Sequence, residues 1–119
     1  MRQWARRLQL GKTTGIHLAV VTAAGLLAGV AIGAAPHVIS QKNREFKPGE
    51  VAIQRGETLQ FVNDDGDLLH HIYLNASAFK FDSGDQQPGS KFDVTFTAVG
   101  DFTVLCAIHP KMKLLVHVK

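Results

Sequence analysis

The chain has 119 residues, a formal net charge of +3 and a single cysteine. These 119 residues leave room for one domain and little more. From Pro36 onward there are nine Lys or Arg against ten Asp or Glu, so the excess positive charge lies in the N-terminal segment. A near-neutral remainder lacks the basic face of a nucleic-acid-binding protein, and we expect no nucleic-acid partner.

The N-terminal segment is basic and then apolar. Its basic part carries Arg2, Arg6, Arg7 and Lys12, and an apolar run follows from Ile16 to Ala35. We predict that residues 1–36 contain a hydrophobic helix that is either a cleaved signal peptide or a membrane anchor. The small residues at 33–35 favour cleavage, whereas a run of about 20 residues favours an anchor. Adjacent arginines also leave a twin-arginine signal open. Each alternative places residues 37–119 in the periplasm, because positive charge stays inside.

Short alternating segments separated by Gly, Pro, Asn and Asp follow from His37 to the end of the chain. This pattern predicts an all-β antiparallel sandwich or barrel. We expect strands over 38–41, 51–53, 59–61, 69–74, 92–96, 102–106 and 112–118, the second and third of them adjacent. Phe46 is expected to enter the core from a loop. Phe79 and Phe81 are expected to pack over one end of the core, with a short helical turn possible in 75–84.

Strand parity distinguishes two consecutive histidines. The cluster Asn63 to Asp67 is expected to be a turn, since it lacks the later glutamate of a calcium loop. In the strand that follows it, His70 shares the parity of the apolar residues Ile72 and Leu74, whereas His71 points the other way. His70 is therefore the inward candidate. His37, His17 and the outward-facing His117 are expected to be incidental.

A seven-residue stretch near the C-terminus carries Cys106, His109 and Met112. The parity of the preceding strand places the Cys106 sulfur at the core end of that strand, and Met112 begins the last strand. A thiolate, two imidazoles and a weak axial thioether form the ligand set of a blue-copper site, so His70 would complete it. A lone buried thiol is the simplest alternative. Zinc is the main rival metal, although methionine is a poor zinc ligand.

The chain resembles the cupredoxins, the small blue type 1 copper proteins that include plastocyanin and amicyanin. The resemblance rests on the segments 46–48, 56–63, 69–72 and 100–112, and the Cys-x-x-His-Pro-x-Met spacing resembles the short ligand loop of amicyanin. It implies a Greek-key β-sandwich over residues 37–119. It also implies one copper ion, cycling between Cu(I) and Cu(II), held by His70, Cys106, His109 and Met112.

The resemblance also implies a role. The protein is expected to be a periplasmic one-electron carrier and not an enzyme, a monomer whose redox partners dock around a partly exposed His109. The alternatives are a copper-delivery protein without redox turnover and a metal-free interaction module. One residue departs from the family pattern: His71 stands where these proteins usually have a bracing Asn. Its imidazole is expected either to replace that brace or to compete for the metal.

Overall fold

The computed structural model describes Gly11, Gly15 and residues 34–119. The predicted N-terminal helix, whether signal or anchor, falls on residues outside this described part. None of the described residues forms a helix with the length and apolar character needed to cross a membrane. From His37 onward the described chain is built from β-strands and connecting loops, as predicted.

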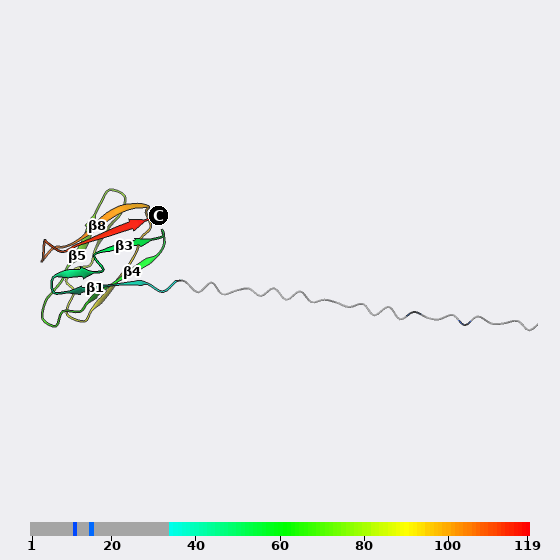
Figure 1. Cartoon of the computed structure of the whole chain (residues 1–119), viewed down its shortest axis with the longest axis horizontal. Coiled ribbons are helices and arrows are strands. Elements are labelled where there is room, and N and C mark those ends of the chain that lie inside the picture. The colour runs from blue at the N-terminus through cyan, green and yellow to red at the C-terminus, as the bar shows by residue number, and fades with distance from the viewer. Residues whose placement is uncertain (1–10, 12–14, 16–33) are drawn as a thin grey trace, which may run out of the picture. The chain divides into compact units, whose positions relative to one another are not determined.

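Within the described residues, nine strands form two sheets, and Figure 1 labels some of these strands. The nine strands are β1 (His37–Lys42), β2 (Glu45–Lys47), β3 (Glu50–Ile53), β4 (Thr58–Asn63), β5 (Ile72–Asn75), β6 (Lys80–Asp82), β7 (Lys91–Thr95), β8 (Gly100–Cys106) and β9 (Lys113–Val118). The first sheet has the order β2-β1-β4-β7, and the second has the order β3-β9-β8-β5-β6. Most connections cross from one sheet to the other, which is the connectivity of Greek-key sandwiches.

The core lies between the two sheets and follows the predicted parities. Leu59 and Phe61 of β4 face it from the first sheet, and Val104 of β8 and Leu114 of β9 face it from the second. All four side chains are fully buried, which removes most of their apolar surface from water. Each sheet is thus apolar on its inner face, and the two faces form one continuous core.

Three expectations about strands were wrong. Phe46 is buried as predicted, but it lies on β2, because a tight turn at Asn43 (φ 55°) and Arg44 (φ 59°) pairs β2 with β1. Two consecutive positive φ values are typical of a type I′ hairpin turn, and arginine is an unusual residue for such a position. The strands expected over 51–53 and 59–61 are also not partners, since β3 pairs with β9 and β4 pairs with β1 and β7. The sandwich is not purely antiparallel as predicted either, because the β1–β4 and β3–β9 pairs are parallel.

Phe79 and Phe81 pack against the core as expected, but the segment between β5 and β7 has no helical turn. Its residues 80–82 form the edge strand β6, which pairs antiparallel with β5. The ring of Phe79 lies 5.0 Å from that of Phe96, within the range of favourable aromatic pairs. This edge strand later matters for His71, because Asp82 ends it.

Candidate metal centre

The β8–β9 loop and the segment before β5 meet at one end of the sandwich. Ile72 of β5 is directly opposite Cys106 of β8, so the residues just before Ile72 lie beside those just after Cys106. The backbone N–H of Ala107 donates to the carbonyl of His71 at 2.8 Å. Figure 1 shows this loop at the opposite end of the strands from the C-terminus.

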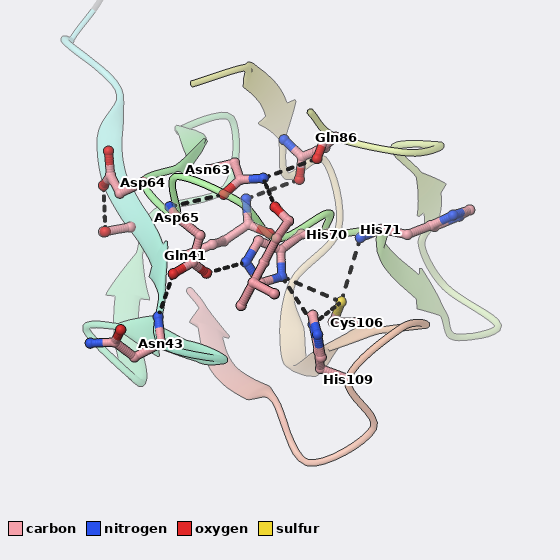
Figure 2. Close-up of polar contacts among 12 residues, drawn as sticks. Gln41, Asn43, Asn63, Asp64, Asp65, His70, His71, Gln86, Cys106 and His109 are labelled. Carbon is pink, nitrogen blue, oxygen red and sulfur yellow. Dashed lines mark hydrogen bonds and ion pairs between the residues drawn. The ribbon is translucent and has the colours of Figure 1, made fainter. Parts of the chain in front are cut away.

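His70, Cys106 and His109 converge there (Figure 2). Cys106 Sγ is 3.8 Å from His70 Nδ1 and 3.8 Å from His109 Nδ1, and the two Nδ1 atoms are 3.3 Å apart. The point equidistant from these three atoms is about 2.1 Å from each, close to metal–nitrogen and metal–sulfur bond lengths in proteins. The three side chains can therefore hold a single first-row metal ion in a trigonal N₂S arrangement.

The three residues differ in access to solvent. His70 and Cys106 are 0% and 1% exposed, whereas His109 is partly exposed. Burial, followed by electrostatic repulsion from the neighbouring basic side chains His70 and Arg44, lowers the pKa of His109. The neutral imidazole is the form that ligates metals. The site is thus closed on the core side and reaches the surface through one imidazole.

The segment that carries His70 is held from both sides. His70 is not within a regular strand, since β5 begins at Ile72, but it forms an isolated antiparallel bridge with Gln86. Backbone hydrogen bonds run in both directions between these two residues, at 3.2 Å and 2.6 Å. The predicted inward parity of His70 is confirmed by its complete burial.

His71 turns its ring away from the cluster (Figure 2). Its Nε2 is 2.6 Å from Asp82 Oδ1 and its Nδ1 is 3.0 Å from Asp85 Oδ1. The hydrogen bond to Asp85, followed by that to Asp82, raises the pKa of His71 against the opposing effect of burial. Both ring nitrogens are thus engaged with carboxylates outside the cluster. Its backbone N–H, by contrast, donates to Cys106 Sγ at 3.4 Å.

Met112 is 1% exposed and directly precedes β9. Its backbone N–H donates to the carbonyl of His109 at 2.9 Å, which closes the loop into a tight turn. The structure therefore places Met112 in the core at the end of the sandwich that carries the three-residue cluster.

Sequence reasoning missed one residue of the site. Asp65 was assigned to the turn cluster, but it is only 8% exposed and its Oδ2 is 2.7 Å from His70 Nε2. Burial alone would raise the pKa of Asp65, but hydrogen bonds from the Asn43 N–H and from His70 outweigh it and lower that pKa. Around metal sites, a carboxylate commonly bonds the second nitrogen of a ligand histidine. An acidic residue five positions before the candidate ligand His70 is therefore the sequence feature that could have indicated Asp65.

Comparisons with known proteins agree with this architecture. No protein-family model matches the chain. The chloroplast plastocyanin of Chlamydomonas reinhardtii is 34% identical over 74 residues, a region that covers 55% of this chain and half of that protein.

Among solved structures, a copper-containing nitrite reductase from Thermus scotoductus matches 76% of this chain and a quarter of its own, with 28% identity and a TM-score of 0.67. An amicyanin variant in the Cu(I) state matches 75% of this chain and 87% of its own, with 17% identity and a TM-score of 0.65. The chain thus spans only half of the plastocyanin and a quarter of the reductase, but nearly all of the amicyanin. Two packed sheets, the predicted ligand loop at one end and these likenesses lead to one conclusion: the chain has a cupredoxin fold.

Proposed function

We propose that this protein is a one-electron carrier that uses a single copper ion cycling between Cu(I) and Cu(II). The observation that carries the proposal is the compact triangle formed by Cys106 Sγ and the Nδ1 atoms of His70 and His109. One thiolate and two imidazoles in a plane are the strong ligands of a blue-copper site. Copper bound there would supply the redox couple, and the protein would supply a fixed geometry.

The hydrogen bonds of the loop support electron transfer over copper delivery. Cys106 Sγ accepts from the His71 N–H, and the Met112 N–H closes the turn onto the His109 carbonyl. Such contacts hold the ligands in one arrangement, so little reorganisation accompanies a change of oxidation state. A delivery protein needs an open site from which the ion can leave, whereas His70 and Cys106 are buried.

Met112 is proposed as the weak axial ligand. Support comes from its burial, from its place immediately after the ligand loop, and from the preference of such sites for a thioether in that position. The donor set favours copper over zinc, since structural zinc sites use Cys and His without methionine.

The partner surface is proposed to lie over His109, in the groove formed by the β1–β2 hairpin and the ligand loop. Asn43, Arg44 and Glu45 line it on one side, and Ile108, Pro110 and Lys111 on the other, next to His109. Ile108 is 43% exposed, an apolar surface suited to a transient contact with a redox protein. We propose a monomer that docks such partners and catalyses no reaction itself.

Export is part of the proposal and rests on the basic and then apolar N-terminal segment. Residues 1–36 are proposed as the export signal or membrane anchor, and residues 37–119 as the copper domain in the periplasm. Mass analysis of the protein from fractionated cells tests this. Loss of the residues before about position 36 indicates a cleaved signal, and a full-length mass in the membrane fraction indicates an anchor. A full-length mass in the cytoplasmic fraction would contradict export.

Adding Cu(II) to the purified full chain tests the central proposal. We expect an intense visible thiolate-to-copper band and the matching paramagnetic spectrum, and Cys106→Ser should abolish the band. His71→Asn should leave the band largely unchanged, because the His71 ring is engaged with Asp82 and Asp85. His117→Asn is the control, because it also removes a histidine but at a position near the end of β9, outside the proposed site, and it should leave the band unchanged. A colourless copper complex of the unaltered chain would refute the proposal.

A further inference from the structure

The buried polar side chains of the described residues all belong to one network around His70. These residues are Gln41, Asn63, Asp65, His70 and Gln86. Burying polar groups is unfavourable unless they are hydrogen-bonded, and an apolar core would form the sandwich without them. Their gathering at one place therefore indicates a task specific to His70.

Each member of the network connects to the next (Figure 2). Gln86 bridges the backbone of His70 and accepts a hydrogen bond from Gln41 Nε2 at 2.9 Å. Asn63 Nδ2 donates to the carbonyls of Leu68 and Gln86, at 2.8 Å and 3.0 Å. Asn63 Oδ1 accepts the backbone N–H of Asp65 at 3.0 Å. The loop between Asn63 and His70 is thus held at both of its ends.

Asp65 is the member that contacts the imidazole itself. Its Oδ2 is 2.7 Å from His70 Nε2, and its Oδ1 accepts the Asn43 N–H at 2.9 Å. Both oxygens of one carboxylate are therefore engaged, and the side chain cannot rotate without losing one of these bonds. Asn43 has a positive φ in the β1–β2 turn, so its N–H is directed by the hairpin geometry.

We infer that Asp65 is a positioning residue that holds His70 as the Nε2–H tautomer, with the Nδ1 lone pair directed at Cys106 and His109. An ionised carboxylate only accepts hydrogen bonds, so the nitrogen that faces it must carry the proton. In a neutral imidazole the other nitrogen is then a free donor to a metal. The same contact restrains the orientation of the ring, because turning the imidazole would break the hydrogen bond between His70 Nε2 and Asp65 Oδ2.

For copper bound as proposed above, this arrangement has a redox consequence that rests on the proposed function. The carboxylate adds negative charge next to a ligand and makes the imidazole a stronger donor, which favours Cu(II) over Cu(I). Asp65→Asn removes the charge with little change of shape. We expect the preference for Cu(II) over Cu(I) to fall about tenfold in this variant. For a one-electron couple, this corresponds to a rise in reduction potential of about 59 mV.

Asp64→Asn is the matched control. It changes the charge by the same amount at the neighbouring position, but Asp64 is exposed and bonds Ser40 rather than the histidine. We expect its potential to stay within about twofold of the unaltered protein, or about 18 mV. Equal shifts in the two variants would overturn the redox consequence, since they would reflect general charge alone.

The tautomer is tested without copper and without any substitution. Nitrogen-15 NMR of the metal-free full chain should show His70 protonated on Nε2 and unprotonated on Nδ1. A neutral His70 protonated on Nδ1 would overturn the inference. In Asp65→Asn, whose amide can either donate or accept, we expect the second tautomer to appear, whereas Asp64→Asn should retain the first. Absence of a blue copper centre would sink the proposed function and leave the tautomer result standing.

Discussion

Asn63→Ala is expected to destabilise the fold because Asn63 closes the loop that presents Asp65 and His70. The alanine variant loses three hydrogen bonds, two donated by Nδ2 and one accepted by Oδ1. The carbonyl of Gln86 keeps a partner, since it also accepts the His70 N–H. The Asp65 N–H and the Leu68 carbonyl are left without this partner, and each buried unsatisfied group costs about 1–3 kcal/mol.

Leu68 is only partly buried, so water can replace part of what its carbonyl loses. We therefore expect a loss of about 3 kcal/mol in the free energy of unfolding. Urea denaturation followed by far-ultraviolet circular dichroism measures it. Asn75→Ala, at the exposed end of β5, is the control and should change stability by less than about 0.5 kcal/mol.

A loss of stability for Asn63→Ala no larger than that of the Asn75→Ala control would contradict this prediction. It would mean that the loop between β4 and β5 is held by its backbone contacts alone. A second readout is the affinity for copper, which we expect to fall in Asn63→Ala, because His70 is no longer held in place. Unchanged affinity together with lowered stability would limit Asn63 to a structural role.

Two further predictions concern the sheets themselves. Leu114→Ala removes a fully buried side chain of β9 and should cost about 2–5 kcal/mol in urea unfolding, whereas Leu115→Ala, on the exposed face, should cost less than about 0.5 kcal/mol; similar losses would contradict the assignment of faces. Hydrogen bonds to Asp101 and Glu50 raise the pKa of His117 above its ordinary value of 6.5. The protonated His117 therefore stabilises the folded state fully below pH 6.5, and this stabilisation is lost as pH rises through the raised pKa. Across that range the difference in free energy of unfolding between the unaltered protein and His117→Asn should shrink. A difference that does not change with pH would contradict the ion pairs of His117.

Several features of the fold could be predicted because they depend on local periodicity. Alternation along β8 and β9 identified the buried residues Val104, Cys106 and Leu114 without knowledge of their partners. The same reasoning selected His70 over His71, since successive side chains of an extended chain point to opposite faces. Spacing and residue type predicted a candidate ligand loop from Cys106 to Met112, and the structure brings Cys106 and His109 of this loop together with His70.

Other features depended on contacts between segments far apart in the chain. Neither the crossing of β3 and β4 into different sheets nor the hairpin at Asn43 and Arg44 follows from alternation, because both depend on pairing and on backbone conformation. The sequence predicted Asp65 only as an acidic turn residue, because its contact with His70 depends on how the loop between β4 and β5 folds.

Alternation and residue type were thus enough to predict which residues face inward and which side chains are candidate metal ligands. The position of Ile72 opposite Cys106, which brings the two imidazoles and the thiolate within reach of one ion, follows from strand pairing and is visible only in the folded chain. The same is true of the His71 ring, which contacts Asp82 and Asp85, and of the buried Asp65 carboxylate, which contacts His70. The parity of a side chain is set within one strand, whereas a site forms only when strands pair and loops close.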